Sequence, residues 1–265
     1  ETVLKQAIPL AIQTKNYKTL AYCYNQLGVV EMDRGNYDLS SHYSLKSFEI
    51  SEKNNLQQNS CNALINLGLL YELQKDTLKA IEYYNLCKKN ALKHNLDDDL
   101  IYAYTNIANL TIKSNKTEAE NMYNKALELA NKNNDLNMQF AINISLSSFY
   151  LSNTNPESNQ KAINCLTKSK NLALQMNNST NLFYVFFNLG GYYNKIKNYD
   201  VAITNYQKAL DLAPLIDDNT QRMNIYKALG EAYHKNNQFD KGYSFQQKYH
   251  NLKDSIFNVE KNKTF

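Results

Sequence analysis

Carboxamide side chains recur at a fixed distance before a small residue along this chain of 265 residues. Asn66, Asn106 and Asn188 each stand two positions before a glycine or an alanine. Gln26 holds the same position in an earlier copy. A carboxamide donates and accepts hydrogen bonds at the same time, so a row of them can hold an extended peptide backbone without reading its side chains. These residues therefore predict recognition chemistry.

Aromatic side chains accompany the carboxamides. They stand six positions before the small residue, or three before it in one copy: Tyr22, Tyr102, Tyr184 and Phe187. Such rings offer a large contact area with few rotatable bonds to immobilise. We expect the carboxamides and the aromatic residues to form one inner binding surface for a peptide or a partner helix. An alternative stays open, in which the Asn side chains bond neighbouring helices and the Tyr rings fill gaps between repeats.

The small residue that sets this register recurs about every forty residues, a period typical of repeat proteins. The position is occupied by Gly28, Gly68, Ala108, Ser147, Gly190 and Gly230. Two more small residues follow in most copies, as in Ser40 and Ser47, Ala80 and Cys87, Ala119 and Ala126, Ala162 and Ser169, and Ala202 and Ala209. Glycine in a helix costs roughly 1 kcal/mol relative to alanine, so its repeated use predicts close helix packing. Gly190→Leu should destabilise the fold by about 1–3 kcal/mol, whereas Lys195→Ala, at a position expected to be exposed, should not.

The pattern resembles the tetratricopeptide repeat, a pair of antiparallel helices. The fifth copy matches the family best, with Leu189, Gly190, Tyr193, Tyr199, Ala202, Tyr206, Ala209 and Pro214 at consensus positions. The resemblance implies an all-α, right-handed superhelical solenoid in which the first helix of each pair lines a concave groove. We expect a single domain with a half-repeat at residues 1–15 and six pairs. The pairs are expected at 17–55, 57–95, 97–134, 136–178, 180–218 and 220–265, the last with an extended C-terminal helix.

Asparagine marks the ends of the expected helices, because it tolerates the left-handed conformation that closes a helix. The pairs concerned are Asn54-Asn55, Asn133-Asn134, Asn177-Asn178 and Asn236-Asn237. Pro9 should kink or delay the first helix because it lacks a backbone N–H. The run from Asn153 to Glu157 is expected to be the longest loop.

Catalytic and metal-binding patterns are weak in this sequence. The histidines are scattered, and no glycine-rich phosphate loop occurs. The acidic run Asp97 to Asp99 lacks the alternating ligands of a calcium loop, and we expect it to cap a helix. The cysteines form no CxxC motif and are expected to be packing residues: Cys23, Cys61, Cys87 and Cys165. We therefore expect a binding protein without cofactor or metal, and not an enzyme.

Charge and hydropathy narrow the choice of partners. The net charge is +4, from 29 basic and 25 acidic residues without a basic block, which argues against direct contact with nucleic acid. No run of eighteen apolar residues occurs. The positions three before the small residue contain one lysine, Lys227, which argues against the family's clamp for a C-terminal carboxylate. Because the chain starts at Glu1 and not at methionine, we expect it to be a processed product or a piece of a longer protein.

Residues 249–261 resemble the end of the repeat region in sensor proteins of the Bacteroidetes phylum. The resemblance implies a membrane tether and a histidine kinase or helix-turn-helix output outside the chain, and an extracytoplasmic, periplasmic location. Leu252, Ile256 and Val259 form an apolar stripe that could dock on the last repeat or continue into a coiled coil, giving an oligomer. Two alternatives are a freestanding cytoplasmic scaffold or adaptor, and a peptide-pheromone receptor of a transcription regulator.

Overall fold

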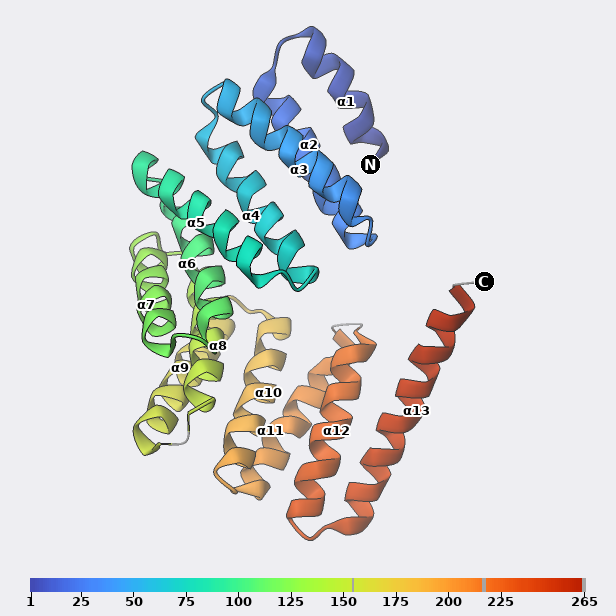
Figure 1. The fold of residues 1–265 in the computed structure, drawn as a ribbon. Coiled ribbons are helices and arrows are strands. Elements are labelled where there is room, and N and C mark those ends of the chain that lie inside the picture. The colour runs from blue at the N-terminus through green and yellow to red at the C-terminus, as the bar shows by residue number, and fades with distance from the viewer. Residues whose placement is uncertain (154, 216–217, 264–265) are drawn as a thin grey trace. The chain divides into compact units, whose positions relative to one another are not determined.

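The computed structural model describes residues 1–153, 155–215 and 218–263 (Figure 1). The described residues form helices joined by short turns and contain no strand. The chain divides into two compact units, Glu1–Asp135 and Leu136–Phe265. Each unit is a stack of helix pairs, so the all-α solenoid class that the sequence predicts is confirmed. The assignment of the whole chain to one domain stays a prediction.

The first unit contains a single helix followed by three helix pairs. Its helices are α1 (Thr2–Gln13), α2 (Tyr17–Asp33), α3 (Tyr37–Lys53), α4 (Gln57–Leu73), α5 (Thr77–His94), α6 (Asp97–Thr111) and α7 (Lys116–Lys132). The second helix of a pair packs against the first helix of the next pair, as α3 does against α4 and α5 against α6. The first helices α2, α4 and α6 also contact their neighbours, so they lie in a row.

The second unit repeats the same packing. It contains α8 (Leu136–Leu151), α9 (Pro156–Gln175), α10 (Ser179–Lys195), α11 (Tyr199–Leu212), the 3₁₀ helix η1 (Ala213–Leu215), α12 (Asn219–Lys235) and α13 (Phe239–Lys263). Its core between α10, α11 and α12 is built on Phe183, Tyr206, Ile225 and Leu229. In the described parts of the two units, no helix is both long and apolar enough to span a membrane.

The helices of a pair meet at the small residues, as predicted. A Cβ atom added at Gly68 would overlap the ring of Tyr84 on α5, and one added at Gly190 would overlap the ring of Tyr206 on α11. Both rings are almost completely buried. The same close approach of two helices recurs at Gly28 and Gly230. The glycines are therefore required by the contact between the helices of each pair.

The corners between helices use the left-handed backbone conformation that the Asn pairs predict. One Asn of each pair has a positive φ angle: Asn55, Asn134, Asn177 and Asn237. Three other corners place lysine in the same conformation: Lys15, Lys75 and Lys197. A residue with a Cβ atom and no short polar side chain is strained there, at a cost of roughly 1–2 kcal/mol.

Relief of this strain gives a direct test of the corners. Lys197 has a φ angle of 63° and an exposed side chain. Lys197→Gly should raise the free energy of unfolding by about 0.5–1 kcal/mol, because glycine adopts this conformation without a steric cost. Lys197→Ala retains the Cβ atom and should give no such gain. Urea denaturation of the three proteins measures both effects, and equal stabilisation by alanine and glycine would contradict the assignment.

Two expectations about the ends of helices need correction. Pro9 does not delay the first helix, because α1 begins at Thr2 and runs through it, while a kink at Pro9 stays a prediction. The run from Asn153 to Glu157 is not wholly a loop: Asn155 caps α9 by accepting a hydrogen bond from the Ser158 N–H, and Pro156 is the first residue of that helix. Thr154 lies outside the described residues.

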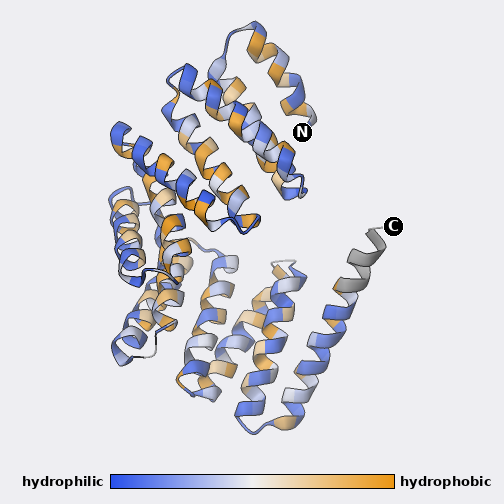
Figure 2. Ribbon diagram, in the orientation of Figure 1, coloured by the Kyte–Doolittle hydropathy of each residue, from blue (hydrophilic) through white to orange (hydrophobic). Residues whose placement is uncertain are grey.

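The last helix, α13, is coloured mainly as hydrophilic in Figure 2. Leu252 and Ile256 are half-buried, and the side chain of Val259 lies outside the described ones. A polar outer helix is what a repeat stack needs at its end, because it covers the apolar face of the last repeat.

Candidate functional site

The first helices α2, α4 and α6 of the first unit surround a cavity of about 490 Å³. We call it the carboxamide groove. It is lined by Tyr22, Asn25, Gln26, Val29, Asn59, Asn62, Ile65, Asn66, Leu69, Tyr102 and Asn106. Five of the eight residues proposed from the sequence line this groove. The repeat spacing places them together because equivalent positions on adjacent first helices face the same side of the stack.

The carboxamides of the groove fall into two groups. Asn66 Nδ2 donates to Asn25 Oδ1 at 2.9 Å, and so joins α4 to α2. This bond between neighbouring helices is the structural role left open by the sequence. Gln26, Asn62 and Asn106 form no side-chain hydrogen bond with the described residues. Their donors and acceptors face the cavity side of the stack and are available to a ligand.

The rest of the lining is aromatic or aliphatic. Tyr22 and Tyr102 are 54% and 47% exposed, so their rings are accessible. Val29, Ile65 and Leu69 supply an apolar patch. The lining contains no charged side chain. A charge brought here without a partner would lose hydration, so the groove favours an uncharged ligand segment.

The remaining three proposed residues, Tyr184, Phe187 and Asn188, lie on α10 in the second unit. The ring of Phe187 lies parallel to that of Phe183 at 6.4 Å and contacts that of Tyr206 at 5.7 Å. Asn188 Nδ2 donates to the Tyr184 carbonyl oxygen at 2.8 Å. The Phe187 ring therefore packs inside the second unit and Asn188 bonds within its own helix, while a ligand-binding role for the three residues stays a prediction.

Sequence reasoning missed part of the lining, although a signal was present. Asn62 holds the position six before the small residue where other copies carry the tyrosines. Asn25 and Ile65 hold the position three before it. A search of the same positions for any polar or aliphatic side chain, and not for tyrosine alone, would have found them.

The acidic run at the start of α6 has structural partners. Asp97 forms an ion pair with Lys132 Nζ at 2.6 Å, Asp98 accepts from Asn133 Nδ2 at 2.9 Å, and Asp99 accepts from Gln58 Nε2 at 2.7 Å. The residue before the helix is Leu96, whose side chain cannot accept a hydrogen bond. The three aspartates therefore occupy the first turn of α6 and not the cap position before it, where their negative charge is favourable to the helix dipole.

Other groups that could do chemistry are also accounted for. The described residues contain no cluster of three or more His, Cys, Asp and Glu side chains suited to a metal ion. The four cysteines are free thiols, and those of Cys23, Cys61 and Cys87 are buried, as expected of packing residues. Burial raises the pKa of Cys23 and Cys165, which disfavours the nucleophilic thiolate.

Comparison with known proteins agrees with the repeat fold. Sequence models of the tetratricopeptide repeat family match residues 19–93 and 183–214. No significant match is found among curated protein sequences. Among solved structures, the chain is similar to the apo form of RapI, with 10% identity, a TM-score of 0.66, and 97% of this chain and 98% of that chain covered.

Two further solved structures share the fold. The apo form of the quorum sensor NprR from B. thuringiensis has 14% identity and a TM-score of 0.66, over 92% of this chain and 68% of that chain. A signal transduction ATPase with a tetratricopeptide repeat sensor from Pyrococcus horikoshii has 17% identity and a TM-score of 0.68, over 98% of this chain and 41% of that one. The sequence matches therefore identify tetratricopeptide repeats at residues 19–93 and 183–214, and the solved structures share the fold of the stacked helix pairs.

Proposed function

We propose that the carboxamide groove binds an extended peptide or a segment of a partner protein. The observation that carries the proposal is the set of three carboxamides, Gln26, Asn62 and Asn106, that surround an uncharged cavity without hydrogen-bond partners among the described residues. A peptide backbone presents a donor and an acceptor at each residue, and a carboxamide matches both. The exposed rings of Tyr22 and Tyr102 would cover the bound segment from either side.

We further propose that the chain is the sensing or interaction region of a larger signal-transduction protein. The fold of two proteins named for sensing, NprR and the Pyrococcus horikoshii ATPase, supports this context. A bound segment can bias the shape of a repeat stack only by the difference between its affinities for the two shapes. The proposal includes an extracytoplasmic location, a membrane tether outside the chain and association through α13. A cytoplasmic adaptor or a peptide-pheromone receptor would use the same groove.

A peptide library tests the groove directly, even before its natural ligand is identified. A displayed library of uncharged twelve-residue peptides supplies the probe, and the tightest binder is measured by isothermal titration calorimetry. Asn62→Ala combined with Asn106→Ala should weaken its binding by about tenfold or more, since each lost hydrogen bond contributes roughly 0.5–1.5 kcal/mol. The melting temperature should stay unchanged, because these side chains bond to no other described residue.

Asn124 provides the matched control for this measurement. It is an exposed asparagine on α7, outside the lining of the groove. Asn124→Ala should leave the affinity unchanged. The proposal is wrong if the library gives no saturable binder, or if the double variant binds as tightly as the unaltered protein.

A further inference from the structure

An aromatic ring and a lysine are paired across the two helices of several repeats. The ring stands four positions before the small residue of the first helix, and the lysine six positions after the small residue of the second. The distance from lysine Nζ to the ring centroid lies between 5.2 and 5.8 Å. The pairs are Tyr24 with Lys46, Tyr104 with Lys125, and Phe186 with Lys208. Each pair is a cation–π contact that covers the junction between the helices.

The second repeat lacks both members of this pair. Leu64 stands where the other repeats have the ring, and Leu86 stands where they have the lysine. Leucine is shorter than tyrosine, and a cavity of about 200 Å³ is present at this place. We call this cavity the side socket. It is lined by Phe48, Glu52, Ser60, Leu64, Leu86, Lys89, Asn90 and Lys93, from α3, α4 and α5.

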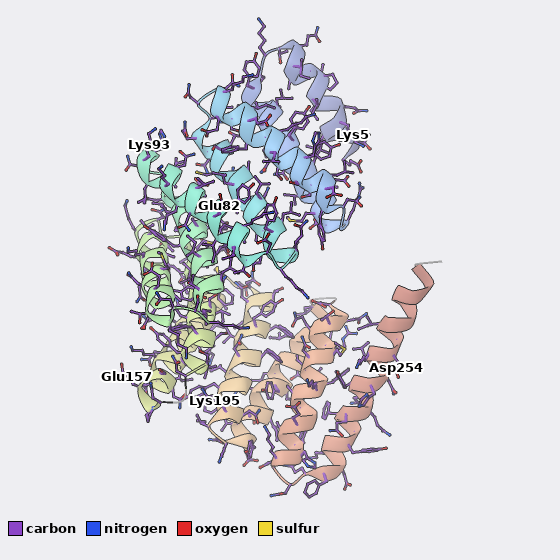
Figure 3. The ribbon with its side chains drawn as sticks, in the orientation of Figure 1. Lys5, Glu82, Lys93, Glu157, Lys195 and Asp254 are labelled. Carbon is purple, nitrogen blue, oxygen red and sulfur yellow. The ribbon has the colours of Figure 1, made fainter. Side chains whose placement is uncertain are left out.

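The floor of the side socket is apolar and its rim is charged. Phe48 and Leu64 lie inside, and Leu86 is 43% exposed at the edge. Lys89 and Lys93 are exposed and form no ion pair within the described chain; Figure 3 labels Lys93, in the last turn of α5. Their ammonium groups are therefore free to meet a ligand.

The polar side of the rim is held in place by hydrogen bonds. Ser60 Oγ donates to Glu52 Oε1 at 2.7 Å, and Asn90 Nδ2 donates to Ser60 Oγ at 3.2 Å. The carboxylate of Glu52 is thereby directed toward Ser60. The two lysines against the single Glu52 leave the rim with an excess of positive charge.

We propose that the side socket binds an aromatic side chain from a partner protein, in a segment whose neighbouring residues are acidic. The ring would occupy the place that Tyr24 and Tyr104 fill in the adjacent repeats. Lys89 or Lys93 would supply the cation that Lys46 and Lys125 supply there. The cavity is smaller than those that hold drug-sized ligands, so it accommodates one side chain. The surplus lysine charge favours carboxylates on either side of the ring.

Three short peptides with blocked ends test the proposal. The first has one tyrosine between two pairs of glutamates, the second has leucine in place of the tyrosine, and the third has lysines in place of the glutamates. Binding is followed by the methyl NMR signals of Leu64 and Leu86. The first peptide should shift these signals saturably and bind at least tenfold more tightly than the other two. Equal binding of the leucine peptide, or no saturable shift with the first peptide, would refute the proposal.

Two variants locate the binding in the socket. Leu64→Tyr combined with Leu86→Lys restores the pattern of the other repeats, so it should fill the socket and weaken binding more than tenfold, as measured by isothermal titration calorimetry because both reporter leucines are replaced. Should that variant misfold, Lys93→Glu alters only an exposed side chain and should weaken the glutamate peptide at least threefold. Lys113→Glu, at an exposed site outside the socket lining, is its charge-matched control and should change binding less. Retention of full affinity by Lys93→Glu would overturn the assignment.

The result is independent of the carboxamide groove. The NMR signals of Tyr102 and Asn106, which line the groove and not the socket, should not move with the acidic peptide. Movement there without movement of Leu64 and Leu86 would assign the peptide to the groove and refute the socket proposal. If Asn62→Ala combined with Asn106→Ala weakens binding of the uncharged library peptide, the binding of the acidic peptide to the socket should be unaffected.

Discussion

Gly190→Ala is expected to lower the free energy of unfolding by about 1–3 kcal/mol, whereas Gly191→Ala should raise it by up to about 1 kcal/mol. The two glycines are adjacent on α10 but face different surroundings. A Cβ atom at Gly190 would overlap the buried ring of Tyr206, whereas one at Gly191 would lie 3.8 Å from the Tyr206 hydroxyl oxygen, an ordinary contact. At Gly191 the only remaining effect is the higher helix propensity of alanine, which stabilises the folded state. Gly190→Leu should lower the free energy of unfolding by more than Gly190→Ala does.

Urea denaturation followed by circular dichroism measures both variants. Because the two expected changes in stability have opposite signs, each variant serves as the control for the other. Loss of stability at both glycines would mean that the helices do not meet at Gly190. Lys195→Ala is not the neutral control that its exposure predicts. Its ammonium group donates to the carbonyl oxygens of Leu151 and Asn153 (Figure 3 labels Lys195). Some loss of stability is therefore expected from Lys195→Ala.

Asp99→Asn is expected to raise the free energy of unfolding at pH 7.5 by about 2 kcal/mol. Asp99 is 2% exposed, and burial raises its pKa to about 6, more than the hydrogen bond from Gln58 lowers it. The rise of the pKa from 3.8 to about 6 means that the buried charge costs the folded state roughly 3 kcal/mol. Removal of the charge also loses its attraction to the start of the helix, which reduces the gain by about 0.3–1 kcal/mol. Asparagine keeps an acceptor for Gln58 without the buried charge.

The pH dependence of this effect has a definite sign. Because the folded pKa lies above the unfolded one, protonation of Asp99 favours the folded state. Its contribution to stability is fully present below about pH 4 and is lost as the pH rises through about 6. The advantage of Asp99→Asn should therefore vanish near pH 4. Thermal unfolding from pH 4 to 7.5 tests this, with Asp38→Asn, at an exposed aspartate in the first turn of α3, as control. A constant difference between Asp99→Asn and the unaltered protein would contradict the assignment.

The spacing of small residues was sufficient to predict the helix pairs. Four of the six first helices begin at the predicted residue, and α10 and α12 begin one residue earlier. This succeeded because close approach of two helices restricts the side chain at the crossing to very small groups, as at Gly68 and Gly190. Such a steric restriction can be read from the sequence, because only very small residues occupy the position.

The candidate site was less predictable for a physical reason. Asn66 and Asn106 hold equivalent positions, yet the side chain of Asn66 donates a hydrogen bond to Asn25, whereas the side chain of Asn106 bonds to no described residue. Phe187 is of a residue type that suits a binding groove, but aromatic rings are equally common in protein cores. In the structure its ring packs on Tyr206. The role of such residues depends on what the neighbouring helix presents, which spacing within one helix does not record.

The row formed by α2, α4 and α6 has an evolutionary consequence. Each first helix touches only its immediate neighbours in the row, and each contributes its own side chains to the carboxamide groove. Duplication or deletion of one forty-residue unit in the gene would thus lengthen or shorten the groove by one step and leave the other interfaces intact. A change in the number of repeats is therefore the simplest way to evolve a groove that binds a longer or shorter segment, because it requires no new contacts.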